Sequence, residues 1–218
     1  ADSLLQFINK LLEFRKSEEG LSELKINQFN ISKHISAWLN SYDPLLKRRA
    51  IELVITMPQN PIFLYCDIDK IQIIVNNLLS NAIKYSTSQS KIQIELSQDE
   101  YNAYFKVQDF GPGIKPNDLD HIFEWYYQSK SSLKKDGSGI GLALSKRFAK
   151  LHNGSLEVKS KINKGSTFIL TLPKDDSLLN KCLDNDSNAQ SNTKFIENQI
   201  KSTTDQSKKQ TDINPLLV

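Results

Sequence analysis

Cysteine is scarce in this sequence, where only Cys66 and Cys182 occur among 218 residues. Two isolated cysteines exclude a disulfide framework and a cysteine-based zinc site, and they are typical of a reducing compartment. Long apolar runs are also missing, because none approaches the roughly 18 residues that a membrane-spanning helix requires. No signal peptide is visible. These absences predict a cytoplasmic domain that itself makes no contact with a membrane.

An excess of one charge is absent as well. The sequence has 28 basic and 25 acidic side chains, a formal net charge of +3, and no long basic run. The sequence therefore gives no reason to expect binding to nucleic acid or to an acidic membrane surface. With 39% hydrophobic and 24% charged residues, the composition is typical of a globular protein and allows one domain, alone or with appendages.

A helix that Asp67 caps, predicted to run to about residue 86, carries an unusual pattern. At about 100° per residue, Asn77, Asn81 and Lys84 lie in one narrow stripe. Most of the remaining surface is apolar, with Ile71, Ile74, Val75, Leu78, Leu79 and Ala82. Carboxamide oxygens are hard ligands that suit Mg²⁺, and an ammonium group beside them suits a polyphosphate. A solvated helix edge is the alternative explanation for this stripe alone.

Asp109 ends a predicted strand, residues 101–109, in which apolar and polar side chains alternate. The alternation places Asp109 on the apolar face, where a carboxylate is costly unless a hydrogen-bond donor meets it. Gly111 and Gly113 follow, and glycines let a backbone lie against a flat ligand. An acceptor-only carboxylate beside such a floor suits an exocyclic amino group, such as that of adenine. The alternative is a plain turn between two elements.

A second glycine-rich stretch, Gly137-Ser138-Gly139-Ile140-Gly141-Leu142, opens a predicted helix that ends near His152. Backbone N–H groups at a helix start can bind phosphate oxygens, and the helix dipole favours this. The glycine spacing is neither a dinucleotide fingerprint nor a P-loop. Further on, Thr167 follows a predicted hairpin turn at residues 163–165 and is a candidate ligand contact, or simply a strand threonine.

The aromatic stretch at residues 122–127 is followed by a polar segment at residues 128–136. This composition is typical of an active-site lid that is hinged by an apolar anchor. An aromatic cluster that seals the edge of a core explains the same residues equally well and is compatible with a lid.

The remaining elements frame these stretches. Ser32 is a candidate cap for a helix that runs to about Arg49 and that Pro44 must break or kink. Residues 21–31 read as a connector. The other predicted elements are an amphipathic helix at residues 1–17, strands at 51–55, 62–66 and 91–96, and a hairpin of strands at 155–162 and 166–172.

Together these stretches resemble the ATP-binding domain of sensor histidine kinases, whose fold is shared with type II topoisomerases, MutL and the large heat-shock chaperone. The resemblance covers about residues 25–173. It rests on five motifs in order: an N box at 77–86, a first glycine box at 109–113, an aromatic box at 122–127, a second glycine box at 137–142 and a short third one at 165–168. It implies an α+β fold, a two-layer sandwich whose mixed, mostly antiparallel sheet is covered on one face by helices.

The resemblance also implies roles for individual residues around Mg²⁺ and ATP. Asn81 would be the Mg²⁺ ligand, while Asn77 and Lys84 would approach the phosphates. Tyr85 would pack on the nucleotide, and Asp109 would accept a hydrogen bond from the adenine amino group. The implied ATP site is completed by Gly111, Gly113, Ile114, Tyr127, Gly137, Ser138, Gly139, Ile140, Gly141, Leu142 and Thr167.

Two positions depart from patterns seen in relatives. The ATP-hydrolysing relatives carry Glu, a general base, where this chain has Asn77, which cannot take up a proton at neutral pH. The resemblance therefore implies that ATP is held without ready hydrolysis, as a phosphoryl donor requires. The aromatic box of many kinases ends in Arg, whereas this chain has Gln128, and lysines at 130, 134 and 135 are candidate replacements.

The domain organisation follows from the same resemblance. Residues 1–20 resemble the end of a dimerisation hairpin, residues 21–173 the catalytic domain, and residues 174–213 have the composition of a flexible linker. Residues 214–218 are a candidate start of a receiver domain. The implied partners are the hairpin of the same protein and a receiver domain, in a parent that is a homodimeric membrane sensor.

The three histidines, His34, His121 and His152, lack the surroundings of a phosphoacceptor and are expected to be surface or capping residues. We therefore expect the chain to bind Mg²⁺ and ATP without phosphorylating itself. Two alternatives remain at this point: a non-catalytic nucleotide-binding switch, and an anti-sigma-factor-like kinase that phosphorylates a protein serine. The N-terminal dimerisation-like helix argues against both.

Overall fold

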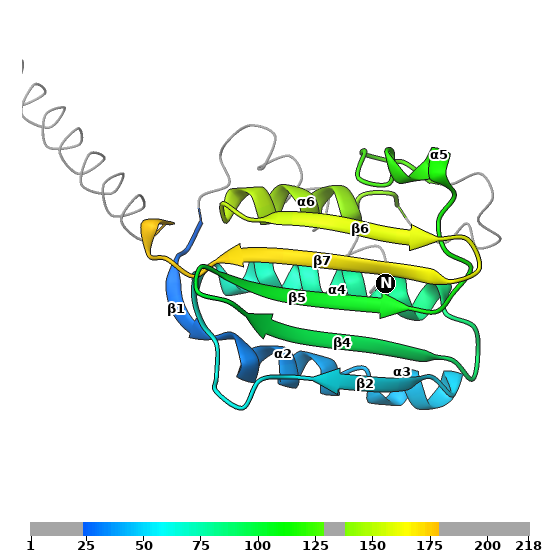
Figure 1. Ribbon diagram of the computed structural model, residues 1–218, viewed down its shortest axis with the longest axis horizontal. Coiled ribbons are helices and arrows are strands. Elements are labelled where there is room, and N and C mark those ends of the chain that lie inside the picture. The colour runs from blue at the N-terminus through cyan, green and yellow to red at the C-terminus, as the bar shows by residue number, and fades with distance from the viewer. Residues whose placement is uncertain (1–23, 129–137, 179–218) are drawn as a thin grey trace, which may run out of the picture. The chain divides into compact units, whose positions relative to one another are not determined.

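The computed structural model describes residues 24–128 and 138–178, and these residues form two layers (Figure 1). One layer is a five-stranded sheet. Its strands are, in spatial order, β2 (Glu52–Thr56), β4 (Lys91–Gln98), β5 (Asn102–Asp109), β7 (Gly165–Pro173) and β6 (Ser155–Lys161). β2 runs parallel to β4, and the other three pairings are antiparallel. This mixed, mostly antiparallel sheet confirms the predicted α+β fold class.

Helices form the second layer and, in Figure 1, α2, α4 and α6 lie behind the sheet. The helices are α2 (Ile31–Asn40), α3 (Asp43–Arg49), α4 (Ile68–Tyr85), α5 (Pro116–Leu119) and α6 (Gly141–Leu151). The side chain of Asp67 caps α4, as predicted, by accepting a hydrogen bond from the backbone of Lys70. Pro44 sits in the first turn of α3, so it separates two helices where the sequence predicted a break.

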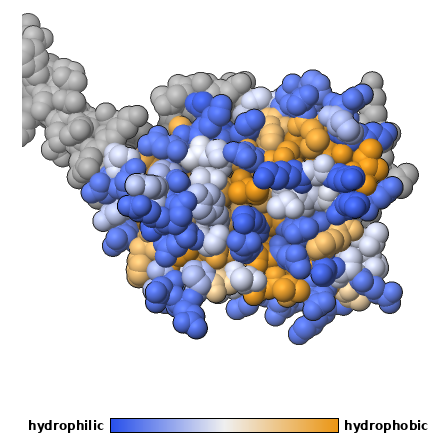
Figure 2. Space-filling view, viewed as in Figure 1, coloured by the Kyte–Doolittle hydropathy of each residue, from blue (hydrophilic) through white to orange (hydrophobic). Residues whose placement is uncertain are grey.

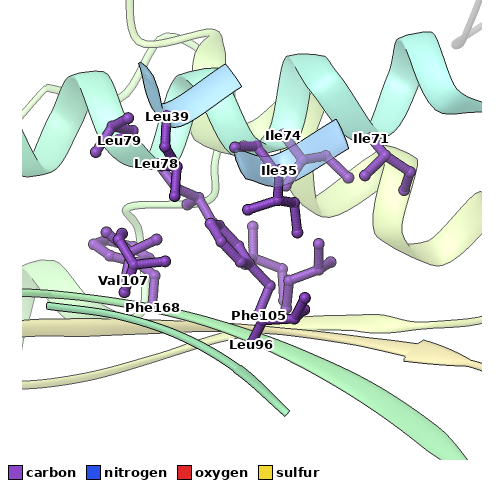
Figure 3. Close-up of a cluster of buried hydrophobic side chains, with 14 of the residues drawn as sticks. Ile35, Leu39, Ile71, Ile74, Leu78, Leu79, Leu96, Phe105, Val107 and Phe168 are labelled. Carbon is purple, nitrogen blue, oxygen red and sulfur yellow. The ribbon is translucent and has the colours of Figure 1, made fainter. Parts of the chain in front are cut away.

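The hydrophobic core lies between α4 and the sheet. Figure 3 shows Ile74 and Leu78 of α4 above Phe105 and Val107 of β5, and all four side chains are buried. Burying a side chain of this size contributes roughly 1.5–3 kcal/mol. Because the apolar surface of α4 is fixed on the sheet in this way, its polar stripe is held at the edge of the core, beside α6.

The N-terminal side of the domain differs from the sequence prediction in two respects. Residues 27–30, predicted as a connector, form strand β1 (Asn27–Asn30), which pairs antiparallel with β3 (Phe63–Cys66). Helix α2 is capped by the side chain of Asn30 and begins at Ile31, so Ser32 is not its cap. A strand of four mostly polar residues carries no alternation signal, and pairing with β3 decides its conformation.

The chain stays attached to the sheet after β7. The backbone N–H of Lys174 donates to the carbonyl of Tyr101 over 2.9 Å, and the Lys174 ammonium donates to the carbonyl of Asp99 over 2.8 Å. Leu178 is buried. Residues 174–178 are therefore part of the folded domain, whereas the sequence placed them in a linker.

Several predicted segments lie outside the described residues: the helix at residues 1–17, residues 129–136 of the predicted lid with its three lysines, the linker beyond residue 178, and residues 214–218. Within the described part of the chain, no helix combines the length and the hydropathy that crossing a bilayer demands.

Candidate functional site

The polar stripe predicted on α4 begins with Asn77, which is buried and faces α6. Its side-chain N–H₂ donates to the carbonyl of Gly141 and to the hydroxyl of Ser145, each over 3.1 Å. The Ser145 hydroxyl in turn donates to the same Gly141 carbonyl over 2.8 Å. The Asn77 carboxamide therefore joins α4 to the first turn of α6, a contact that the sequence did not predict.

The stripe opens toward solvent at the C-terminal end of α4. Asn81 and Lys84 are half-buried, and Tyr85 is 39% exposed. The Lys84 ammonium lies 5.0 Å from the centre of the Tyr85 ring, a cation–π distance. A carboxamide oxygen, an ammonium group and an aromatic ring are thus presented together along one end of this helix.

Asp109 lies at the end of β5 on the sheet face that packs against the helices, as predicted, and it is 5% exposed. Its carboxylate accepts a hydrogen bond from the backbone N–H of Gly111 over 2.9 Å. Burial raises the pKa of the Asp109 carboxyl, and hydrogen bonds from the backbones of Gly111 and Ser166 oppose this rise. Two oxygens offer about four acceptor sites, so the carboxylate can still accept from a ligand.

Gly111 places the loop after β5 against the end of α4. A Cβ atom built on Gly111 would lie 2.5 Å from the carbonyl oxygen of Tyr85 and 3.0 Å from a carboxylate oxygen of Asp109. Only glycine permits this approach. The loop therefore places the Asp109 carboxylate beside the C-terminal end of α4 at Tyr85, and together they form one wall of the candidate site.

Gly113 and Ile114 hold the loop after β5 in place. Gly113 has a φ angle of +71°, and a Cβ there would collide with the carbonyl of Lys161. The backbone N–H of Ile114 donates to the hydroxyl of Ser160 over 2.8 Å. Both residues therefore anchor the loop on the hairpin of β6 and β7, a role that the sequence did not predict.

The second glycine-rich stretch is described from Ser138 onward, and Gly137 lies outside the described residues. Ser138, Gly139 and Leu142 are half-buried. A Cβ on Gly139 would lie 2.6 Å from the backbone of Tyr126, so this stretch rests on the aromatic box. Gly141 begins α6 beside Asn77, and its N-terminal turn faces the stripe of α4.

The side chains of Ile140 and Tyr127 are both engaged within the protein. The Ile140 side chain is fully buried in the hydrophobic core, so only its backbone is available. The Tyr127 hydroxyl donates to the carboxylate of Asp118 over 2.7 Å, which ties it to α5. Its ring lies 5.6 Å from that of His121. The sequence could not reveal that α5 would engage this hydroxyl.

Thr167 is placed on the opposite face of the sheet from Asp109. It pairs with Gln108, and both line a groove of about 160 Å³ that also contains Gln93 and Lys106. This groove belongs to the sheet face that is turned toward the viewer in Figure 2. Thr167 therefore lies on the face that is turned away from the Asp109 carboxylate, and its contact with a ligand stays a prediction.

The residue that faces Asp109 is Ser166, which the sequence analysis missed. Ser166 is buried, its backbone hydrogen-bonds Asp109, and its hydroxyl lies 3.0 Å from that of Ser160. Alternation along β7, in which Phe168 is also buried, could have identified Ser166 as the inward hydroxyl of the third glycine box.

Each of the three histidines contacts other groups of the protein. His152 ends α6 and is buried, and both ring nitrogens are hydrogen-bonded, to the carbonyl of Phe148 and the backbone N–H of Asp67. His121 is exposed and lies 2.8 Å from the carboxylate of Glu124. His34 packs between two aromatic rings. The sequence predicted that each histidine is either a surface or a capping residue, and His152 is a capping residue.

A cation at this site would depend on few protein ligands. The described residues contain no group of three or more His, Cys, Asp or Glu side chains that could hold a metal ion. The carboxamide of Asn81 is a hard oxygen ligand, and Mg²⁺ is commonly held by one or two protein groups together with phosphate oxygens and water. The donor set therefore fits a cation that arrives with a polyphosphate.

Comparison with protein families gives a match that covers most of the fold. Residues 66–176 match the family described as histidine kinase-, DNA gyrase B-, and HSP90-like ATPase. The matched range includes α4, the loop after β5, the N-terminus of α6 and the hairpin of β6 and β7.

Individual relatives agree with this match. The circadian input-output histidine kinase CikA of Synechococcus elongatus is 29% identical over 177 residues, which are 79% of this chain and 23% of CikA. Hybrid signal transduction histidine kinase D of Dictyostelium discoideum is 30% identical over 180 residues, 79% of this chain and 12% of that protein. This chain therefore spans less than a quarter of the length of either relative.

Among solved structures, full-length ShkA in complex with AMPPNP superposes with a TM-score of 0.68 at 24% identity. The superposition covers 79% of this chain and 36% of ShkA. At this identity the likeness establishes the fold.

Proposed function

Because the chain belongs to the histidine kinase-, DNA gyrase B-, and HSP90-like ATPase family, we propose that it binds Mg²⁺ and ATP and donates the γ-phosphoryl group to a histidine. The observation that carries the proposal is the buried Asp109 carboxylate, which is held against the end of α4 by Gly111. A buried acceptor held against the end of the helix that carries Asn81 and Lys84 is suited to a ligand with an amino group at one end and phosphates at the other.

The base would be recognised by Asp109. Its carboxylate is an acceptor and cannot donate while ionised, so it accepts from the amino group of adenine and repels the carbonyl that guanine has at that position. The exposed ring of Tyr85 offers an aromatic surface for the base or sugar.

The phosphates would lie between the end of α4 and the start of α6. Lys84 provides a positive charge, and the first turn of α6 offers backbone N–H groups and the positive end of a helix dipole. Mg²⁺, held by Asn81 and the phosphate oxygens, would supply charge neutralisation to the transferred group.

Transfer to an acceptor requires that water does not take the phosphoryl group first. Asn77 occupies the position of a general base but carries an amide, and its N–H₂ group is engaged by Gly141 and Ser145. The chain therefore has no base at this point to activate water. Catalysis would consist of positioning and charge stabilisation.

The acceptor would be an imidazole on a dimerisation hairpin of a homodimeric parent, from which a receiver domain then takes the phosphoryl group. Support comes from the histidines of this chain, since His152 is buried and His121 is paired with Glu124. Similarity to a hybrid histidine kinase supports a receiver partner. We place the domain on the cytoplasmic side of a membrane sensor.

Radiolabelling with γ-labelled ATP tests this proposal. The chain alone should bind ATP without stable labelling of its three histidines, and adding the dimerisation hairpin of the parent should produce acid-labile phosphohistidine on the hairpin. Tight ATP binding with no label on the hairpin would instead identify a nucleotide-binding switch. Acid-stable label on a protein serine would identify a serine kinase of the same fold.

A further inference from the structure

Arg49, the last residue of α3, reaches across to the C-terminal end of α4. One guanidinium nitrogen donates to the carbonyl of Ile83, and another donates to the carbonyl of Ser86 over 3.0 Å. The last carbonyls of a helix have no partners within the helix and carry partial negative charge. The planar fork of an arginine can bind two of them at once, which a lysine cannot do in the same way.

The turn that Arg49 binds is the one that forms the wall of the candidate site. Lys84 and Tyr85 lie between the two carbonyls that accept from the guanidinium. The carbonyl of Tyr85 is the atom against which Gly111 packs, and the backbone of Gly111 holds the Asp109 carboxylate. A shift of this turn would therefore move the ammonium group, the aromatic ring and the base-recognising carboxylate together.

The end of α3 gives Arg49 a fixed direction. Ala50 adopts a left-handed conformation, with a φ angle of 51°, and its N–H donates to the carbonyls of Leu46 and Lys47. The Leu46 side chain is buried, so the helix end is anchored in the core. Arg49 is half-buried, whereas its neighbour Arg48 is exposed. Arg49 therefore donates to α4, and the adjacent, exposed Arg48 offers a matched comparison.

We infer that Arg49 is a positioning residue of the nucleotide site, which acts by fixing the last turn of α4 and not by touching the nucleotide. This inference rests on the proposed function, because it concerns the binding of ATP. Arg49 lies outside the matched family range of residues 66–176. The inference predicts that base discrimination, which depends on Asp109, responds to a change on α3.

The test compares Arg49→Met, Arg49→Lys and the matched control Arg48→Met in the full chain. ATP and GTP affinities are measured by calorimetry with Mg²⁺ well below the melting temperature of each variant. We expect Arg49→Met to weaken ATP binding by about tenfold, since small misplacements of a site have effects of this size or larger, and to narrow the preference for ATP over GTP. Arg49→Lys should lie between Arg49→Met and the wild type, and Arg48→Met should match the wild type.

Two results would overturn the inference. The first is a folded Arg49→Met variant with a lower melting temperature but unchanged affinities, which would make Arg49 a structural cap alone. The second applies if Arg49→Met does not fold. The test then rests on Arg49→Lys, and ATP and GTP affinities equal to those of the wild type in that variant would overturn the inference. A wild-type chain that binds no ATP would instead refute the proposed function, and the two failures are therefore distinguishable.

Discussion

The backbone N–H of Asp67 donates a hydrogen bond to Nε2 of His152 over 3.0 Å, and this bond joins the N-terminus of α4 to the C-terminus of α6. Nδ1 of the same ring donates to the carbonyl of Phe148 over 2.7 Å. The ring is therefore neutral, with its proton on Nδ1. Burial is the main cause that lowers the pKa of His152.

The His152 contact predicts a dependence of stability on pH. Unfolded histidine takes up a proton near pH 6.5, whereas His152 in the fold does so only at a lower pH. The free energy of unfolding should therefore fall as the pH drops below about 6.5. Urea denaturation between pH 5 and 8 should show this slope in the wild type, and the slope should be smaller in His152→Gln. In His121→Gln the slope should be at least as steep as in the wild type, because the hydrogen bond to Glu124 raises the pKa of His121, and its removal takes away a contribution that grows as the pH falls.

His152→Gln should also lower the stability at pH 7 by about 1–3 kcal/mol, because it leaves the N–H of Asp67 or the carbonyl of Phe148 poorly paired in a buried place. An unchanged pH slope in His152→Gln would show that another group carries the titration.

Asp109→Asn should separate stability from binding. Burial raises the pKa of Asp109, so the ionised carboxylate is held less favourably in the fold than in the unfolded chain, and the neutral amide should raise the free energy of unfolding at pH 7. ATP affinity should fall roughly 10- to 100-fold, since a hydrogen bond to a charged group is lost. Denaturation and calorimetry measure the two effects.

The exposed Asp69 provides a control, because Asp69→Asn removes the same charge from the start of α4. It should leave ATP affinity unchanged. We claim that the Asp109 carboxylate lowers the stability of the fold and strengthens ATP binding. A loss of both stability and ATP affinity in Asp109→Asn would contradict this claim.

Asn77→Asp tests the contact between α4 and α6. The substitution keeps the shape but replaces the N–H₂ donor, which lies 3.1 Å from the Gly141 carbonyl, with an acceptor. Two facing acceptors should destabilise the chain at pH 7 by about 1–3 kcal/mol. Asn76→Asp is a matched control, since Asn76 uses its oxygen to accept from Tyr42, and a carboxylate preserves that role. Equal stability losses in the two variants would refute the assignment.

Asn81→Ala tests the predicted metal ligand. ATP affinity of the wild type should rise when Mg²⁺ is added, and this rise should be mostly lost in Asn81→Ala, because no cluster of acidic or histidine side chains among the described residues could replace the carboxamide. Ser80→Ala, an exposed neighbour on the same helix, should behave like the wild type. Titration with ATP in Mg²⁺ and in EDTA makes the comparison.

The elements with strong periodicity were predictable from sequence. The apolar pattern of α4 and the alternation in β4 and β5 are set by burial on one face, and the same alternation placed Asp109 inward correctly. The weakly patterned β1 was missed, because its four residues are stabilised by pairing with β3, which is distant in sequence.

The site could be predicted only where a residue's role is local. Alternation fixes the side on which Asp109 lies, and counted back from the buried Phe168 it also places Ser166, and not Thr167, on the inward face of β7. The partners of Asn77 and Tyr127 belong to α6 and α5, and no pattern along the chain indicates which helix will lie opposite.

Calorimetric titration of the full chain with ATP and GTP in the presence of Mg²⁺ tests the central claim most directly. The account predicts one binding site, tighter binding of ATP than of GTP, and loss of that preference in Asp109→Asn. Equal binding of the two nucleotides, or ATP binding that neither Asp109→Asn nor Asn81→Ala weakens, would contradict it.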